Sequence, residues 1–276
     1  MGFKVEGPCR VVQFPGDGSS TYYVGQLVAF SAASAAATPG GVVPLAVPSG
    51  IDDITNLQTV AGVVVGFNRR TPTYNATWLA NYDGGAITDQ ATQLARDWAL
   101  NKGMYAIGDP QLLIDVAMVT SETLLEGPIY NNAYGTAPTV VTDTGGADTT
   151  GYTTAGTTGA ADFTPVAYNC SIYCRTGKNA GLYRTTNDTT NTAPDVDIAF
   201  PYDVVAGDTF VRVPLKQGLS AIYISGPGMY INCSLGAATN YWNVIVEKLD
   251  LAVAKQEKAL FRFCPGAFNH YRALVS

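Results

Sequence analysis

The stretch TVAGVVVGF, residues 59–67, contains four valines, two glycines and no charged residue. Its apolar residues follow one another without the alternation that is typical of a strand with one face in water. Valine favours strands because its branched side chain packs well on a pleated surface. The stretch therefore predicts a β-strand that is buried on both faces.

Similar runs lie on both sides of this strand. They are short, rich in Val, Ile, Tyr, Phe and Thr, and end at Gly, Pro or Asp, as strands do. The further predicted strands are 10–14, 21–30, 42–47, 104–110, 111–119, 165–173, 195–200, 208–215, 219–225, 229–235, 241–253 and 259–263. No repeat of fixed period occurs, and no linker separates halves of different composition. We therefore expect one all-β domain over residues 1–276, a sandwich or barrel of short strands.

One segment has helical periodicity instead. In ITDQATQLARDWALNKG the apolar residues Ile87, Leu94 and Trp98 recur at helical spacing. Thr88 can cap the start of a helix, and Gly103 can end it. We expect one helix over about 87–102, packed on the side of the β-domain.

Residues 136–165 form a stretch rich in Thr and Gly. It has eleven Thr and five Gly, and Val140 and Val141 are its only large aliphatic residues. Thr favours strands, whereas so many glycines argue against a stable core strand. We expect an insertion within the single domain, either an exposed loop or arm or a pair of weak, exposed strands. An arm of this kind could bind a partner's strand edge through its backbone.

The charge balance excludes several classes of protein. With 16 basic and 22 acidic residues, the net charge of −6 argues against a nucleic-acid binder, which needs a basic surface. Charged residues make up 14% of the chain, against roughly 25% in typical soluble domains. This low share is typical both of subunits in large assemblies and of secreted or surface β-proteins. No apolar run is long enough for a membrane span, and MGFKVEGPCR lacks the apolar core of a signal peptide. We therefore expect no membrane partner and no export through a signal peptide.

Residues suited to catalysis are scarce. His270 is the only histidine, so any Ser/His/Asp or Cys/His mechanism would have to use it. The chain has no G-x-S-x-G motif, no phosphate-binding glycine loop and no zinc-ligand spacing. Asp195 and Asp197 share a face of a predicted strand, but such spacing is common by chance. The sequence predicts a protein that is not an enzyme and that needs no metal or other cofactor.

The chain has five cysteines, an odd number that cannot all pair within one molecule. Cys170 and Cys174 would lie about 13 Å apart on a predicted strand, too far for a disulfide. We expect buried free thiols, with one intermolecular disulfide as the alternative.

The segment 68–85, NRRTPTYNATWLANYDGG, is the strongest candidate for a protein interface. It is rich in Arg, Tyr and Trp, the residue types that most often anchor interfaces. The alternative is that Trp78 packs beneath the following helix. The Thr/Gly stretch and the basic C-terminal region supply further candidates. The predicted interface residues are Arg69, Arg70, Tyr74, Trp78, Tyr82, Thr149, Tyr152, Arg262, His270 and Arg272.

Three segments carry a resemblance to a known family. GQLVAF (25–30), TVAGVVVGF (59–67) and MYAIGDPQLLIDVAM (104–118), with Asp109-Pro110 before an alternating strand, resemble the head decoration (cement) proteins of tailed bacteriophages. The resemblance covers residues 20–120 and rests on pattern and on small residues. The predicted helix at 87–102 and the C-terminal half depart from the family's pattern.

The resemblance implies a virion structural protein without an active site. Such a protein is made in the host cytoplasm and lies on the outer surface of the capsid, where it clamps neighbouring major capsid subunits. It implies a homo-oligomer, a trimer in preference to a dimer, because an oligomer axis can coincide with a local axis of the shell. Two alternatives stay open: the major capsid protein itself, and a carbohydrate-binding or tail-fibre β-module. For the second, Tyr130, Tyr152, Tyr168 and Tyr183 are candidate sugar-binding aromatics.

Overall fold

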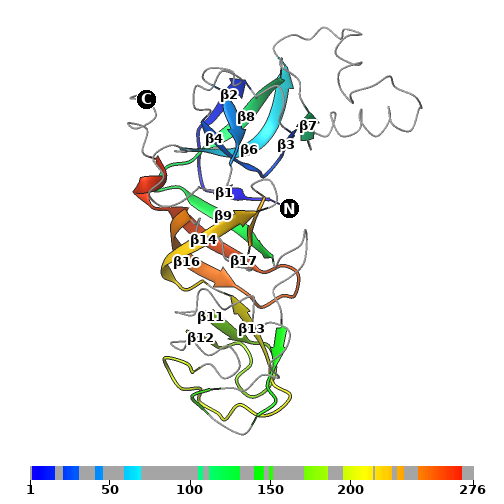
Figure 1. Ribbon diagram of the computed structural model, residues 1–276, viewed down its shortest axis with the longest axis vertical. Coiled ribbons are helices and arrows are strands. Elements are labelled where there is room, and N and C mark those ends of the chain that lie inside the picture. The colour runs from blue at the N-terminus through cyan, green and yellow to red at the C-terminus, as the bar shows by residue number, and fades with distance from the viewer. Residues whose placement is uncertain are drawn as a thin grey trace, which may run out of the picture. The chain divides into compact units, whose positions relative to one another are not determined.

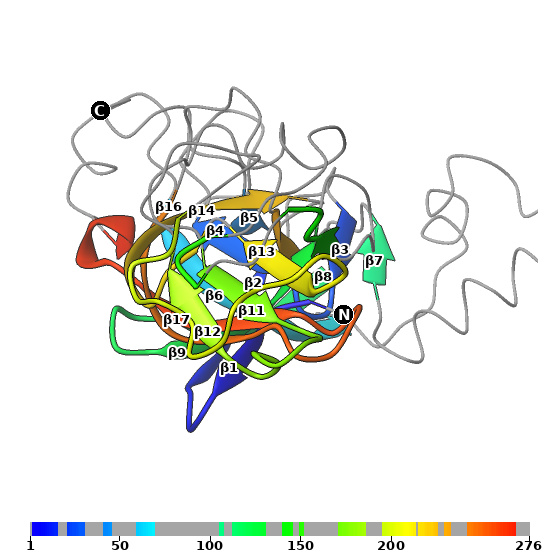
Figure 2. The same ribbon diagram turned by 90° about the horizontal axis from the view of Figure 1, so that it is seen from below.

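A computed structural model shows the fold, and Figures 1 and 2 give two views of it. It describes residues 2–15, 21–30, 41–45, 59–69, 105–107, 112–130, 140–145, 149–151, 171–185, 195–213, 215–225, 229–232 and 242–268. We expect one domain from the sequence, whereas the chain divides into two compact units. Unit 1 comprises 1–125, 227–229 and 263–276, and unit 2 comprises 126–226 and 230–262.

The expectation of an all-β fold is confirmed, because the described residues form sheets, mostly of antiparallel strands with a parallel pairing of β9 and β15, and one 3-10 turn, η2 (Pro265–Phe268). The strands that begin in unit 1 are β1 (Lys4–Glu6), β2 (Val11–Pro15), β3 (Thr21–Tyr23), β4 (Leu27–Phe30), β5 (Val42–Pro44), β6 (Val60–Arg69), β7 (Tyr105–Ile107), β8 (Leu112–Met118) and β9 (Leu124–Tyr130). Those that follow are β10 (Val140–Thr142), β11 (Ser171–Cys174), β12 (Tyr183–Thr185), β13 (Thr209–Val213), β14 (Gly218–Ser225), β15 (Tyr230–Asn232), β16 (Trp242–Asp250) and β17 (Lys258–Phe263).

Unit 1 is built on a five-stranded sheet of order β2-β8-β6-β4-β5, with β3 paired to β7 beside it. Its central strand, β6, comes from the stretch TVAGVVVGF. Val60, Ala61, Val63 and Val64 are all buried, which confirms the predicted burial on both faces. The pairing with β8 shifts by one residue between Val64 and Gly66, and Val65 at this bulge is 46% exposed.

The glycine at position 62 is required by the packing of β6 against β8. A Cβ atom on Gly62 would overlap the backbone carbonyl of Ala117 and lie 2.7 Å from Cγ1 of Val116. Both neighbours belong to β8 in the middle of the sheet, so neither can move away cheaply. The glycine in TVAGVVVGF therefore sets how closely the two strands approach.

The strands of unit 2 form two sheets. In the first, the order β9-β15-β14-β16-β17 is joined by a further pairing of β9 with β17, so the five strands close into a ring. Closure of this kind pairs strand edges that would otherwise be free. The second sheet has the order β10-β13-β11-β12. Its core cluster consists of Ile172, Cys174, Val196, Phe200, Val204 and Phe210.

Most of the predicted strands are confirmed, although several are shorter than expected. The predicted strand at 195–200 is wrong. Asp195 forms an isolated bridge with Gly151, and the chain bends at residues 197–198. The sequence analysis does not predict β1, β9 or β12. β9 contains Gly127 and Pro128, which usually interrupt strands.

Two expectations lie wholly or partly outside the described residues. The predicted helix at 87–102 lies entirely outside them. Of the Thr/Gly stretch 136–165, the structure describes 140–145 and 149–151. Val140–Thr142 forms β10, an edge strand paired with β13. Asp143, the next residue in the sequence, is 1% exposed. This part of the stretch therefore belongs to the sheet.

Three cysteines fall within the described residues, and each is a free thiol. Cys174 is buried in unit 2, as expected, whereas Cys9 is exposed and Cys264 is partly buried. Burial raises the pKa of the Cys174 thiol to about 12, while the nearby Arg184 lowers it to a smaller extent. Cys174 is therefore protonated at neutral pH.

Substituting Gly62→Ala should destabilise unit 1, because the added methyl has no space against β8. We expect a loss of roughly 1–3 kcal/mol in the free energy of unfolding, measured by chemical denaturation. Gly266→Ala is the matched control, since a Cβ at position 266 meets no atom within 4 Å. Equal stability of the two variants would contradict the tight approach of β6 and β8.

Thiol reactivity should differ sharply between Cys9 and Cys174. Alkylation requires the thiolate, which the raised pKa and the burial of Cys174 both suppress. Brief iodoacetamide treatment of the native protein at mildly alkaline pH, followed by peptide mass spectrometry, should modify Cys9 and leave Cys174 unmodified. Both should react after denaturation in guanidinium chloride. Rapid modification of native Cys174 would show that its surroundings are open to solvent.

Candidate functional site

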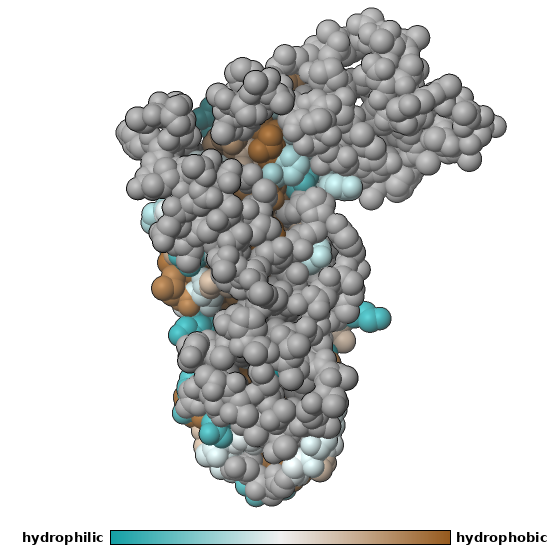
Figure 3. All heavy atoms as spheres, in the orientation of Figure 1, coloured by the Kyte–Doolittle hydropathy of each residue, from teal (hydrophilic) through white to brown (hydrophobic). Residues whose placement is uncertain are grey.

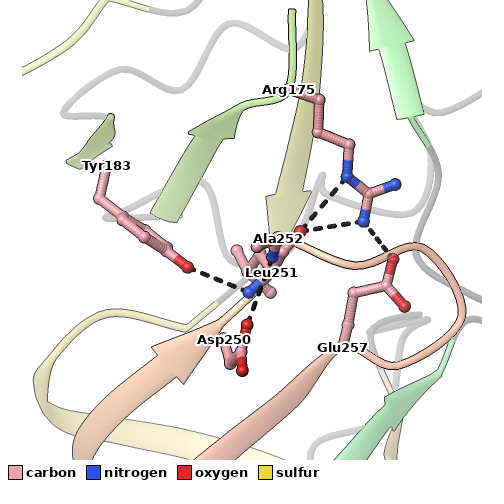
Figure 4. Close-up of polar contacts among 6 residues, drawn as sticks. All are labelled: Arg175, Tyr183, Asp250, Leu251, Ala252 and Glu257. Atoms are coloured by element: carbon pink, nitrogen blue, oxygen red, sulfur yellow. Dashed lines mark hydrogen bonds and ion pairs between the residues drawn. The ribbon is translucent and has the colours of Figure 1, made fainter. Parts of the chain in front are cut away.

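A buried ion pair connects the two sheets of unit 2 (Figure 4). Arg175 follows β11, and Glu257 precedes β17. Nη2 of Arg175 lies 2.5 Å from Oε1 of Glu257, whose side chain is completely buried. The same guanidinium donates to the carbonyl oxygen of Leu251, from Nη2 at 2.9 Å and from Nε at 3.3 Å. Arg175 thus holds both ends of the connection between β16 and β17.

Backbone hydrogen bonds fix the position of this pair. The amide of Arg175 donates to the carbonyl of Thr209, which continues the pairing of β11 with β13. The carbonyl of Glu257 accepts from the amide of Ile129 in β9, at 2.8 Å. The acidic partner is therefore tied to the closed ring of strands, and the basic partner is tied to the second sheet.

Tyr183 of β12 belongs to the same network. Its hydroxyl oxygen accepts a hydrogen bond from the amide of Leu251 at 3.0 Å, as Figure 4 shows. Its ring lies 4.7 Å from the ring of Tyr173, centroid to centroid, at an angle of 52°. Burial raises the pKa of the Tyr183 phenol, although the hydrogen bond from Leu251 has the opposite effect. The side chain is therefore a neutral phenol, fixed by the hydrogen bond at its hydroxyl and by the packing of its ring. The residue is nevertheless 39% exposed.

Beside Tyr183, unit 2 has a cleft of about 480 Å³. Strand β12, the bend at 197–198, Gln217 and strand β16 supply its walls. The lining residues are Ser171, Tyr183, Arg184, Thr185, Asp197, Ile198, Gln217, Glu247, Lys248 and Leu249. The bend lies along β12 because the amide of Asp197 donates to the carbonyl of Thr185 at 2.8 Å.

Two charged residues of the cleft are fixed by neighbouring groups. Arg184 donates to the carbonyls of Tyr183 and Ala199, and its guanidinium lies 5.3 Å from the centre of the Phe200 ring. Glu247 accepts from Nε of Arg262 at 2.8 Å. These contacts give the cleft walls of defined shape.

Three other residues of the cleft have polar groups available to a ligand. The side chains of Asp197, Gln217 and Lys248 make no hydrogen bond or ion pair with the described part of the chain. Asp197 offers acceptors, Lys248 offers donors, and Gln217 offers both. With Arg184 and Glu247 included, the cleft has two acidic and two basic residues. It is suited to binding a polar ligand without net charge.

The structure describes only part of the predicted interface. Arg69 ends β6 opposite Leu112. Thr149 is half-buried, and its carbonyl accepts from the amide of Phe200 at 2.7 Å. Arg262 lies on β17 and pairs with Glu247 of the cleft. The predicted residues outside the described part of the chain are Arg70, Tyr74, Trp78, Tyr82, Tyr152, His270 and Arg272.

Of the cleft and the ion pair, the sequence indicates Tyr183 alone, and it gives no sign of the pairing of Arg175 with Glu257. Tyr183 is among the four tyrosines proposed as sugar-binding aromatics. Tyr152, Tyr168 and the side chain of Tyr130 lie outside the described residues. Arg175 and Glu257 are 82 positions apart, and neither belongs to a motif. No local signal in the sequence could have paired them.

Comparison with protein-family models, with curated proteins and with solved structures found no match. Across the described ranges, no group of three or more His, Cys, Asp or Glu residues could hold a metal ion. No helix within these ranges has the length and apolar character that crossing a membrane requires.

Removing either member of the buried ion pair should strongly destabilise unit 2. Arg175→Ala leaves the Glu257 carboxylate buried without its partner, and Glu257→Ala leaves the largely buried Arg175 guanidinium without its counter-ion. Each should lower the free energy of unfolding by about 3–5 kcal/mol, and the double variant should lose less than the sum of the two. Thermal and chemical denaturation measure these losses.

The matched control for this cycle is Glu126→Ala. It breaks the ion pair of Glu126 with Lys258, whose side chains are 33% and 40% exposed, and should cost about 0–1 kcal/mol. Losses at Arg175 and Glu257 no larger than the loss at Glu126 would show that the buried pair does not hold unit 2 together.

Proposed function

We propose that the protein is a virion structural protein that decorates the outside of a tailed-bacteriophage capsid and clamps neighbouring major capsid subunits. One observation carries the proposal. The segments that resemble phage decoration proteins come together in unit 1, where 27–30, 60–69 and 112–118 form the adjacent strands β4, β6 and β8. A resemblance scattered along the chain thus corresponds to one continuous piece of sheet.

The exposed surface of this sheet is consistent with a partner. Val11 of β2 is 53% exposed, and Val65 at the bulge of β6 is 46% exposed. Figure 3 shows that some described residues at the surface are apolar, in brown, and lie near hydrophilic ones, in teal. Apolar side chains within a polar surround are typical of protein interfaces.

The proposed mechanism is mechanical and needs no active site. Each copy binds across the boundary between major capsid subunits, so separating the subunits exposes the buried apolar surface again. A homo-oligomer, a trimer in preference to a dimer, places identical contacts around a local axis of the shell. The protein would be made in the host cytoplasm and would join the outer surface of the assembled head.

The test uses phage heads assembled without this protein. Purified protein should bind these heads saturably and raise the temperature at which they release DNA, followed with a DNA-binding dye. Heads that already carry the native protein are the control and should gain nothing. Absence of saturable binding, or an unchanged release temperature after binding, would overturn the proposal.

The predicted interface can be examined in the same assay. Arg70→Ala and Trp78→Ala should reduce head binding at least tenfold without lowering the stability of the purified protein, because these residue types dominate interface energies. Asp203→Ala, at an exposed position of unit 2, is the control and should bind like the original. If the Trp78 variant binds heads as tightly as the original protein, segment 68–85 is not part of the interface with the capsid.

A further inference from the structure

We infer that the cleft of unit 2 is a binding site for a neutral saccharide. This inference goes beyond the decoration role and does not depend on it, because the cleft lies within unit 2 and the resemblance lies within residues 20–120. The size of the cleft, its polar groups and its aromatic side chain all favour such a ligand.

The size of the cleft fits a small ligand. Its volume of about 480 Å³ falls within the range of roughly 300–1,000 Å³ found for small-molecule sites. The buried Ser171 and Leu249 line it from the interior, whereas Asp197, Gln217 and Lys248 are exposed at its opening. A pyranose ring in the cleft could therefore contact the apolar side chain of Leu249 and the polar groups at the opening together.

The polar groups favour hydroxyl groups over charged ligands. A sugar hydroxyl can both donate and accept a hydrogen bond. Neighbouring hydroxyls can therefore donate to Asp197, accept from Lys248, and either donate to or accept from Gln217. Asp197 would repel an anionic ligand, and Lys248 would repel a cationic one. Because groups of both signs line the cleft, we expect a neutral polyol to bind better than a charged ligand.

The aromatic side chain is held in place before any ligand binds. The hydroxyl of Tyr183 is occupied by the amide of Leu251, and its ring packs against Tyr173. Tyr183 lines the cleft and is 39% exposed, so we expect part of this fixed ring to be accessible to a ligand. The C–H face of a pyranose packs on such a surface, and a fixed ring loses little conformational entropy when it binds.

The polar network of Figure 4 explains why the ring is rigid. Arg175 fixes the carbonyl of Leu251, and Tyr183 is bonded to the amide of the same residue. The ion pair with Glu257 thus orients Tyr183 through Leu251. In this arrangement Tyr183 contacts the ligand, and Arg175 is a positioning residue.

The experiment applies the full-length protein to an array of neutral, sialylated and sulfated oligosaccharides. The neutral glycan that binds best is then titrated by calorimetry. We expect binding to neutral glycans, with affinity reduced at least tenfold in Asp197→Ala and in Lys248→Ala. Both residues are exposed and without side-chain partners in the described part of the chain, so these variants should unfold at the original temperature.

Asp203→Ala is the matched control, because it removes an exposed carboxylate of unit 2 outside the cleft. It should bind the glycan like the original protein. The inference is overturned if no glycan binds, if only sialylated or sulfated glycans bind, or if the Asp197 and Lys248 variants retain full affinity for the neutral glycan.

Discussion

The buried carboxylate of Glu257 is the constraint on which unit 2 depends. A carboxylate taken fully out of water is tolerable only when it is paired and hydrogen-bonded. Arg175 pairs with one carboxylate oxygen, Oε1, from the second sheet, whereas Oε2 has no hydrogen-bond partner in the described part of the chain. The backbone of Glu257 is bonded to β9 in the ring of strands. The ends of the two sheets are therefore linked through one charged contact. Arg175 also donates to the carbonyl of Leu251, and the amide of Leu251 donates to the hydroxyl of Tyr183. The ion pair therefore also helps to position Tyr183 in the wall of the cleft.

Unit 1 depends on a different constraint, the close approach of two strands. Gly62 leaves room for the backbone of β8, and the valines on both sides of it fill the core. Such packing gives a stiff sheet, because close-packed interiors transmit strain rather than absorb it. Stiffness suits a protein proposed to resist the separation of capsid subunits. The proposed saccharide site lies in unit 2, whereas the segments that resemble decoration proteins form strands of unit 1.

The sequence predicts strands well where consecutive residues are buried. It predicts them poorly where contacts between distant parts of the chain determine the structure. The strand in TVAGVVVGF is predicted correctly, because burial on both faces requires an uninterrupted run of apolar residues, which is visible in the sequence itself. Residues 195–200 have the composition of a strand, yet Val196 and Phe200 fill the core while Ile198 is 68% exposed, which strand alternation does not produce. β9 was missed because Gly127 and Pro128 suggest a break, although β15 and β17 both pair with it. The ion pair joins residues 82 positions apart, and no pattern within one segment encodes such a contact.

An electron cryo-microscopy map of the virus particle tests the proposed function most directly. Decoration predicts a complete shell made of another protein, with density for this chain outside it around a local symmetry axis. The all-β units 1 and 2, each fitted by itself, should account for that density. Density for this chain within the continuous shell, or on the tail alone, would contradict the account. Those results would identify the chain as the major capsid protein or as a tail-fibre module.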